Sequence, residues 1–225
     1  WRAFTISKLM NKIRWGIIGP GAIANNFADA LKESYSGELL AIASRTSTRL
    51  EEFGNKYNVS KEFRFNDYDQ LLDDENIDAV YISTPHVFHA DLSIKAAGKG
   101  KHILCEKPLE TTVEKIDRIA EVVKSTGIQM ACVFQNRENP EYKKLKTFVE
   151  LGSLGKILLC QTSINWYRPP TYYEGTWRGT KALDGGAALI NQGIHTIDLM
   201  VDLMGEVALV SGFVDTLHHQ IEGED

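Results

Sequence analysis

Short apolar runs alternate with longer segments of helical character over residues 13–133 of this 225-residue chain, and no other feature constrains its fold as strongly. The apolar runs occupy residues 13–18, 39–43, 79–82, 102–105 and 130–133. Between them, apolar residues recur at helical spacing in residues 24–31, 48–57, 87–97 and 113–124. Strands that are apolar throughout and separated by helices are typical of a parallel sheet covered on both faces. The alternation therefore predicts a doubly wound α/β domain over residues 13–134.

The pattern changes after residue 134. The order predicted there is a helix, a long strand, an irregular stretch, a second helix and a second strand, at residues 140–151, 156–167, 168–186, 187–204 and 207–214. Long strands with separate helices indicate an α+β domain over residues 135–225, with an open, mainly antiparallel sheet.

Two strands are too few for a stable sheet, because three or more with an apolar face are generally needed. We therefore expect Ile157, Leu159, Val210 and Phe213 to lie partly exposed, and the sequence to be a truncated version of a longer protein. Residues 1–12, which include the natural-looking start Met10, are expected to be an N-terminal extension.

Charge and cysteine content exclude several classes of protein. The formal net charge of −5 is spread along the chain, and no basic run suits nucleic acid. No apolar stretch approaches the length that crosses a bilayer, and residues 1–9 lack the apolar core of a secretory leader. Cys105, Cys132 and Cys160 stand far apart without a C-x-x-C motif, which argues against disulfides and a thiolate zinc site. We expect a cytoplasmic protein whose cysteines are small core residues.

A glycine-rich turn follows the first apolar run directly and opens the first predicted helix. It fits the G-x-G-x-x-A pattern of dinucleotide-binding loops with Gly19, Pro20, Gly21, Ala22, Ile23 and Ala24. Gly19 would allow the tight turn, Gly21 would let the backbone approach a pyrophosphate, and Ala24 would keep the helix close to the strand. The helix N-terminus would face the phosphate anion. A plain strand-to-helix turn is the alternative, but the position of the loop favours dinucleotide binding.

The residues after the second apolar run bear on the choice between NAD and NADP. An acidic group there accepts hydrogen bonds from the ribose 2′-OH, whereas an arginine accommodates a 2′-phosphate. The chain has Ser44 and Arg45, and no carboxylate before Glu51. This favours NADP, although Arg45 could instead stack on adenine or be solvated.

A charged pair, Glu106 and Lys107, follows the apolar run at residues 102–105. Ligands of open α/β sheets lie beyond the carboxyl ends of the strands. Pro108 biases Lys107 against helical geometry and so keeps it at the strand edge. A lysine there could hydrogen-bond a reacting oxygen and stabilise negative charge as it develops. A surface ion pair between the two neighbours is the alternative.

The helix predicted at residues 187–204 carries a polar stripe beside an apolar one. The apolar stripe consists of Ile190, Ile194, Ile197, Val201 and Met204, and the polar stripe of Asn191, His195, Asp198 and Asp202. A histidine with a carboxylate three residues later and an amide four residues earlier has neighbours that could orient it. That suits a general acid/base whose tautomer must be fixed. A solvated polar face is the alternative.

Metal binding is another possible role for His86, His89 and His195. His86 and His89 are three residues apart and Asp91 follows, but no set of carboxylates and histidines with recognisable metal spacing completes a site with His195. We therefore predict no metal.

Four separated motifs together resemble the glucose–fructose oxidoreductase / inositol dehydrogenase (Gfo/Idh/MocA) family from residue 13 to the end of the sequence. They lie at residues 19–24, 84–89, 106–108 and 185–198. The resemblance implies a Rossmann domain followed by a domain whose open sheet mediates dimer or tetramer formation. It also implies hydride exchange between NAD or NADP and a secondary alcohol or ketone of a sugar, nucleotide sugar or cyclitol.

The same resemblance implies roles for individual residues. Lys107 would contact the reacting hydroxyl, and His195 would take or return its proton, with Asn191 beside them. The residues expected to hold the cofactor are Gly19, Pro20, Gly21, Ala22, Ile23, Ser44, Arg45, Thr84, Pro85, His86, His89 and Glu106. Those expected to hold the substrate are Tyr167, Arg168, Tyr173, Trp177, Arg178 and Asp198, since aromatic rings and arginines suit sugar faces and an anionic group.

Two departures from the family pattern concern this site. Many members carry an aspartate where this chain has Asn191, and an asparagine where it has His86. Two other functions remain open: a nucleotide-binding regulator without turnover, and a glycosidase that oxidises and re-reduces its substrate on NAD. The presence of both Lys107 and His195 weighs against the regulator.

Overall fold

The computed structural model describes residues 12–225, so residues 1–11 of the predicted N-terminal extension lie outside the described part of the chain. The described chain forms two compact units. The first contains residues 12–84, 91–106 and 117–131, and the second contains residues 85–90, 107–116 and 132–225. The segments at residues 85–90 and 107–116 therefore belong to the second unit, although the Rossmann pattern of the sequence runs through them.

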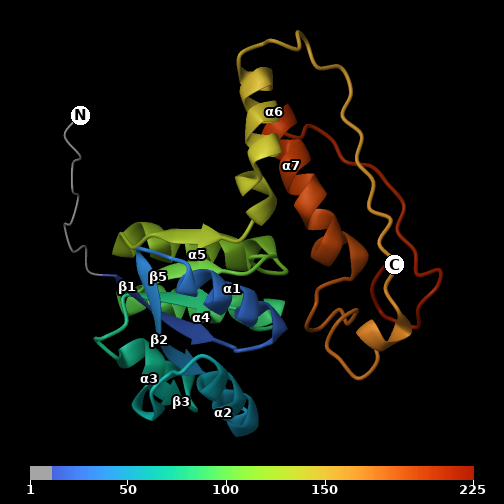
Figure 1. Ribbon diagram of the computed structural model, residues 1–225. Helices are drawn as coiled ribbons and strands as arrows, with labels where there is room; N and C mark the ends of the chain where they lie inside the picture. The colour runs from blue at the N-terminus through green and yellow to red at the C-terminus, as the bar shows by residue number, and fades with distance from the viewer. Residues whose placement is uncertain (1–11) are drawn as a thin grey trace, which may run out of the picture. The chain divides into compact units, whose positions relative to one another are not determined.

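The first unit is built on a six-stranded sheet with the strand order β3-β2-β1-β4-β5-β6 (Figure 1). The strands are β1 (Ile13–Ile18), β2 (Gly37–Ala43), β3 (Arg64–Phe65), β4 (Ala79–Ile82), β5 (His102–Cys105) and β6 (Met130–Cys132). The pairs β1–β2, β1–β4, β2–β3 and β4–β5 are all parallel. This confirms the predicted doubly wound sheet, in the strand order of the Rossmann fold.

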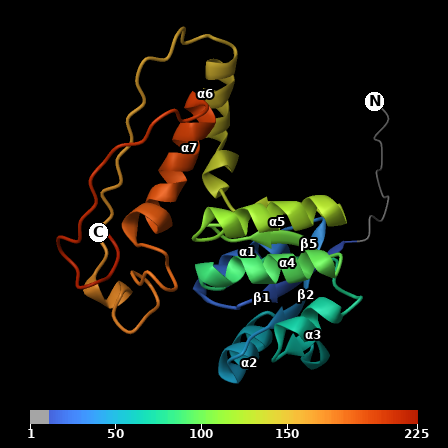
Figure 2. The ribbon, with the colours of Figure 1, turned by 180° about the vertical axis from the view of Figure 1, so that it is seen from behind.

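Helices cover both faces of this sheet. They are α1 (Ala22–Lys32), α2 (Ser47–Lys56), α3 (Tyr68–Asp73), α4 (His89–Gly98) and α5 (Val113–Thr126). Figures 1 and 2 show α1 on one face and α4 and α5 on the other, as right-handed crossovers in opposite directions require. The sheet is buried between them, and Ile17, Ile42 and Ile82 have no exposed surface. The sequence pattern did not indicate β3 or α3, because each is short.

The second unit contains two long helices. Its helical elements are η3 (Gln135–Glu138), α6 (Pro140–Glu150), η4 (Pro170–Tyr172), the π-helix η5 (Ala188–Gly193) and α7 (Ile194–Met204). Asn139 caps α6, since its side chain accepts from the N–H groups of Glu141 and Tyr142, and Gly205 ends α7 with a φ of +88°. Both predicted helices are present, but the first turns of the second are π-helical.

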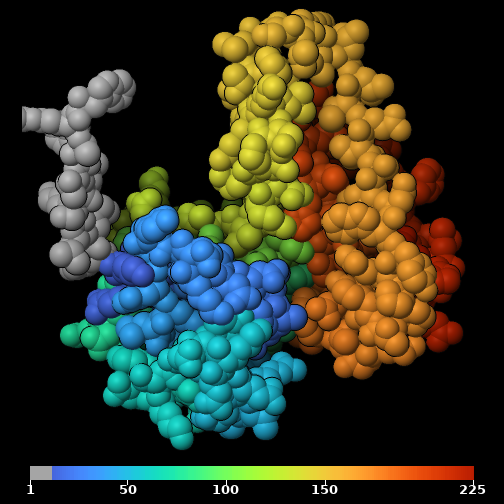
Figure 3. Space-filling model, viewed as in Figure 1, coloured from blue at the N-terminus to red at the C-terminus, as the bar shows by residue number. Residues whose placement is uncertain are grey.

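The structure corrects the prediction of two strands in this unit. Residues 156–167 and 207–214 run beside each other without regular secondary structure, orange and red in Figures 1 and 2. Leu159 is 78% exposed and Val210 is 83% exposed, and the space-filling view shows the orange segment on the surface (Figure 3). Two strands that bury no apolar face gain too little to offset the entropy of ordering them. The predicted exposure of these side chains is confirmed, while Ile157 is half-buried.

Within residues 12–225, the helices are all too short or too polar to span a membrane.

Candidate active site

The glycine-rich loop joins β1 to α1 in the first unit. Gly19 has a φ of +85°, and a Cβ there would lie 2.9 Å from Cγ2 of Thr84, so only glycine fits. Its N–H donates to the carbonyl oxygen of Ala43 at 3.1 Å. Gly21 is the N-cap of α1, and the nearest atom to a Cβ there would be 3.9 Å away. The loop therefore leaves open space beside the helix N-terminus, where backbone N–H groups and the helix dipole favour an anion.

Two further predicted cofactor residues follow β2. Ser44 is buried, and its hydroxyl donates to the carbonyl oxygen of Thr46 at 3.2 Å. Arg45 is exposed, with its guanidinium 5.8 Å from the ring centroid of Tyr68. Arg45 therefore lies just after the carboxyl end of β2, and its contact with a 2′-phosphate stays a prediction.

Glu106 lies at the carboxyl end of β5 and is buried in the first unit. The hydroxyl of Tyr81, on β4, donates a short hydrogen bond to its carboxylate. Burial, and then the charge of Glu106, raises the pKa of the Tyr81 phenol far above its usual range. The phenol therefore stays protonated and orients the carboxylate.

Lys107 belongs to the second unit and contacts Asn191, 84 residues later. Its Nζ donates to the backbone oxygen of Asn191 at 2.7 Å and to Oδ1 of the same residue at 2.9 Å. Asn191 lies in η5, and π-helical turns occur often at functional sites. The peptide bond between Lys107 and Pro108 is cis. The structure thus brings together two of the three predicted catalytic residues.

His195 lies in the first turn of α7 and is 8% exposed. Burial, and next the positive charge of Lys107, lowers the pKa of its imidazole, while Asp198 opposes this effect. Its Nδ1 is buried and has no hydrogen-bond partner among residues 12–225. The ring is therefore neutral at neutral pH and can accept a proton.

Asp198 and Asn191 do not orient His195 as the helical spacing predicted. The carboxylate of Asp198 accepts from Nε of Arg137 at 2.8 Å and from Nη2 at 2.6 Å. The amide of Asn191 is engaged by Lys107 and by Asp184. Partners from distant segments compete for both side chains, which spacing along one helix does not reveal. The alternative of a solvated polar face is excluded, because Asn191 and His195 are buried whereas Ile197 and Met204 are 38% and 42% exposed.

His86 and His89, which were predicted to bind the cofactor, form hydrogen bonds between segments of the second unit. Nδ1 of His86 lies 3.0 Å from the carbonyl oxygen of Asp184 and 3.1 Å from its Oδ1. His89 has no exposed surface, and its Nδ1 donates to the carbonyl oxygen of Pro108 at 2.8 Å. Pro85 is half-buried next to His86. No cluster of three or more His, Cys, Asp or Glu side chains in the described part of the chain could hold a metal ion.

Most of the predicted substrate residues form a cluster of rings and guanidinium groups. Arg168 and Arg178 lie over the ring of Tyr172, at 4.9 Å and 4.6 Å from its centroid. The ring of Trp177 packs edge-on against His86 with centroids 4.9 Å apart. Tyr173 is buried, whereas Tyr167 is 72% exposed.

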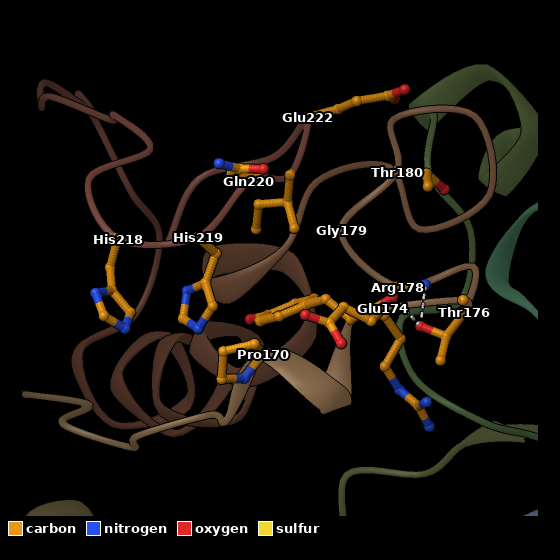
Figure 4. A pocket seen from close by; sticks show the side chains of 13 residues that line it. Pro170, Glu174, Thr176, Arg178, Gly179, Thr180, His218, His219, Gln220 and Glu222 are labelled. Atoms are coloured by element: carbon orange, nitrogen blue, oxygen red, sulfur yellow. Dashed lines mark hydrogen bonds between the residues drawn. The ribbon is translucent and has the colours of Figure 1, made fainter.

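A cavity of about 820 Å³ opens beside this cluster (Figure 4). Figure 4 shows His218 and His219 at one side, and Thr176 and Arg178 at the other. Neither Lys107 nor His195 lines the cavity. Hydrogen bonds link it to Lys107, because the N–H of Gly179 in its wall donates to Asp184, which accepts from Asn191, and Asn191 accepts from Lys107.

Sequence reasoning missed three residues of this region. Asp184 directly precedes the motif at residues 185–198 and was given no role, because no spacing rule connects it to His86, 98 residues earlier. Tyr81 was part of an apolar strand, and Arg137 was given no role. Their functions depend on partners that only the folded chain brings close.

Comparison with known proteins places this geometry in a family. Residues 13–134 match the model of an oxidoreductase family described as an NAD-binding Rossmann fold, and residues 142–225 match the GFO/IDH/MocA C-terminal domain. The chain belongs to the GFO/IDH/MocA oxidoreductase family. The resemblance carried by the four sequence motifs is confirmed.

Individual members of the GFO/IDH/MocA family show how far the similarity extends. The chain is 33% identical over 195 residues to myo-inositol 2-dehydrogenase of Thermotoga maritima, covering 86% of this chain and 55% of the relative. It is 26% identical to trans-1,2-dihydrobenzene-1,2-diol dehydrogenase of Mus musculus, covering 86% of this chain and 56% of the relative. The chain spans about half the length of these curated relatives.

Solved structures of the family superpose well. The WlbA dehydrogenase of Bordetella pertussis, in complex with NADH and UDP-GlcNAcA, has a TM-score of 0.89 and 31% identity, covering 95% of this chain and 65% of that chain. The aldose-aldose oxidoreductase of Caulobacter crescentus has a TM-score of 0.74 and 26% identity, covering 87% of this chain and 58% of that chain.

Proposed function

We propose that this protein is an NAD(P)-dependent oxidoreductase that transfers a hydride between nicotinamide and a secondary alcohol or ketone of a sugar, nucleotide sugar or cyclitol. Residues 13–134 form its dinucleotide-binding domain, and residues 135–225 contribute to substrate binding and oligomerisation. The observation that carries the proposal is the pairing of Lys107 with Asn191 in the same unit as a buried His195 of lowered pKa.

Each residue has a defined task in the oxidation direction. The cofactor supplies the hydride acceptor. The substrate carbon loses hydride as its hydroxyl oxygen loses a proton, and neutral His195 takes that proton. The ammonium of Lys107 donates to the same oxygen and stabilises the negative charge that develops on it. In reduction the protonated His195 returns the proton to the alkoxide.

The substrate class is supported by the cluster at residues 166–178 and by the family. Guanidinium groups beside aromatic rings suit a sugar ring that carries a carboxylate or phosphate. The relatives named above are an inositol dehydrogenase and a structure with a bound nucleotide sugar acid.

A substrate screen tests the proposed activity. Sugars, nucleotide sugars and cyclitols are mixed with the protein and each dinucleotide, and nicotinamide absorbance is followed. A net change with at least one substrate is expected, and Lys107→Ala and His195→Ala should each lower kcat by about 10²–10⁴-fold. Lys99→Ala, which removes an exposed lysine, is the matched control. Near-normal turnover of either variant would remove that residue from the mechanism.

The alternatives give different results in the same screen. A non-catalytic regulator binds the dinucleotide without turnover of any substrate. A redox glycosidase releases a hydrolysis product without net change in nicotinamide absorbance.

We also propose a preference for NADP, which rests on the exposed Arg45 and the absence of a carboxylate in residues 44–50. A charge-assisted contact to the 2′-phosphate contributes about 1.5–3 kcal/mol, so NADP should bind roughly tenfold or more tightly than NAD. Calorimetric titration of both dinucleotides measures this. Tighter binding of NAD than of NADP contradicts the proposal, and so does an unchanged ratio of the two affinities in Arg45→Ala. The test is needed because a related structure contains bound NADH.

The assembly is proposed to be a cytoplasmic homodimer or homotetramer. The exposed apolar side chains of Leu209, Val210 and Phe213 support the oligomer, because contact with another copy of the chain would remove them from water. The sparse, odd number of cysteines supports the cytoplasmic location, because it suits a reducing compartment. Sedimentation of the protein at micromolar concentration as a monomer would contradict the oligomer.

A further inference from the structure

Asp184 is a carboxylate with no exposed surface, directly before the glycine pair at residues 185–186. Its Oδ2 accepts from the N–H of Gly179 at 2.7 Å. Its Oδ1 accepts from Nδ2 of Asn191 at 3.2 Å and lies 3.1 Å from Nδ1 of His86. Burying a carboxylate is costly unless donors surround it, and here three donors from three segments do so.

Asp184, Asn191 and Lys107 form a chain of hydrogen bonds. The chemistry of its two ends, Asp184 and Lys107, determines the direction of each bond. An ionised carboxylate only accepts, and an ammonium only donates. Asn191 lies between Asp184 and Lys107, so its Nδ2 must face Asp184 and its Oδ1 must face Lys107. A carboxamide is suited to this place, because a carboxylate at position 191 would bring two acceptors within about 3.2 Å of each other.

Asp184 also determines which nitrogen of His86 carries a hydrogen. Nδ1 of His86 lies near two oxygens of Asp184, the backbone carbonyl at 3.0 Å and Oδ1 at 3.1 Å, and both are acceptors. Nδ1 is therefore the protonated nitrogen. One buried carboxylate thus orients both the amide that holds Lys107 and the ring of His86.

We infer that Asp184 is a positioning residue, which holds the Asn191 amide with its oxygen toward Lys107 and so keeps the ammonium in one orientation. This inference rests on the proposed function, because it is the catalytic use of Lys107 that gives the orientation a role. Asp184 itself touches neither substrate nor cofactor in this role, and its effect passes through Asn191.

A relocation of the carboxylate tests the inference. Asp184→Asn keeps the volume but replaces one of the two acceptor oxygens by a donor, so either Nδ2 of Asn191 or the N–H of Gly179 loses its acceptor. We expect kcat to fall about 10–100-fold, as for other residues that orient a functional group. The KM for the cofactor should change little. Asn191→Asp should also lower kcat, because two carboxylates then face each other. The double variant D184N/N191D restores a donor opposite an acceptor with the original net charge, and should recover at least about tenfold in kcat over D184N.

Thermal unfolding supplies a measurement that does not need activity. In N191D the facing carboxyl groups share a proton, so their folded-state pKa lies above the unfolded value. The melting temperature of N191D should therefore fall relative to the original protein as pH rises from 5 to 9, while that of the double variant should follow the original protein. Glu150→Gln, which removes an exposed carboxylate on α6, is the matched control and should show no such trend.

The outcomes separate this inference from the proposed function. If the double variant shows only the sum of the two single effects in kcat and melting temperature, Asp184 does not act through Asn191 and the inference is wrong. If D184N does not fold but D184N/N191D does, the coupling is established; if both fail to fold, the inference is wrong. An active Lys107→Ala variant together with coupled melting temperatures would refute the proposed function while leaving the pairing intact.

Discussion

At the scale of single residues, two glycines of the β1–α1 loop are required for different reasons. Gly19 needs its positive φ, and a Cβ there would strike Thr84, whereas Gly21 has open space around it. Gly19→Ala should therefore lower the free energy of unfolding by about 1–2 kcal/mol. Gly21→Ala should leave stability within about 0.5 kcal/mol but weaken dinucleotide binding by about tenfold or more, because its methyl group occupies the space beside the helix N-terminus.

Thermal unfolding and calorimetric titration of both variants separate the two effects. Unchanged dinucleotide affinity in a folded Gly21→Ala variant would show that no pyrophosphate approaches this loop.

The protonation of His195 makes a second prediction at this scale. Its pKa lies below the ordinary value of 6.5, because of burial and then the charge of Lys107. The neutral ring that accepts the substrate proton therefore predominates at pH 7, and the midpoint of the acid-side decline in oxidation rate should lie below pH 6.5. Lys107→Met removes a positive charge and should raise the pKa of His195, while Asp198→Asn should lower it. Titration of the imidazole by NMR checks both directions; an acid limb above pH 7 would contradict the assignment.

At the scale of elements, Asp202 joins α7 to α6 and η3. Its carboxylate accepts from Nζ of Lys146 at 2.7 Å, from the hydroxyl of Tyr142 at 2.5 Å and from Nη1 of Arg137 at 3.0 Å. The hydrogen bond from Lys146, and next that from Tyr142, lowers the pKa of this carboxyl. The three contacts explain why the polar stripe of α7 is turned toward its neighbours.

Asp202→Asn should lower the free energy of unfolding by about 1–2 kcal/mol at pH 7, since these charged hydrogen bonds are partly solvated. A depressed folded-state pKa stabilises the fold above the unfolded value of 3.8 and loses that contribution as pH falls through the folded value. The difference between variant and original protein should therefore shrink below pH 4. Denaturant unfolding at pH 7 and pH 3 measures it, and an equal difference at both pH values would show that charge is not the cause.

At the scale of the whole molecule, stability is distributed unevenly among the described residues. Ile17 has no exposed surface, whereas Phe213 is fully exposed. Ile17→Ala should cost about 2–5 kcal/mol, while Phe213→Ser should change the stability of the monomer by less than about 0.5 kcal/mol. Denaturant unfolding of the two variants measures both values. A large loss in Phe213→Ser would show that residues 207–214 contribute to a packed surface.

The parallel sheet could be predicted from the sequence because its information is local. The bounds of β1, β4 and β5 agree with the apolar runs at residues 13–18, 79–82 and 102–105. A buried parallel strand must be apolar throughout, so the pattern reports it directly. The prediction of strands at residues 156–167 and 207–214 was wrong because their formation does not depend on local sequence alone. β-forming residues make a sheet only where partner strands and a covering layer bury one face.

The sequence by itself therefore determined the sheet, the glycine loop and the chemical types of the site residues Lys107, Asn191 and His195. Only the tertiary structure decided which side chains meet: Lys107 with Asn191, Asp184 with His86, and Arg137 with Asp198. Periodicity and spacing report burial and neighbours within one element. Hydrogen bonds between residues 61 to 98 positions apart depend on how loops close and elements pack, and no local pattern records that.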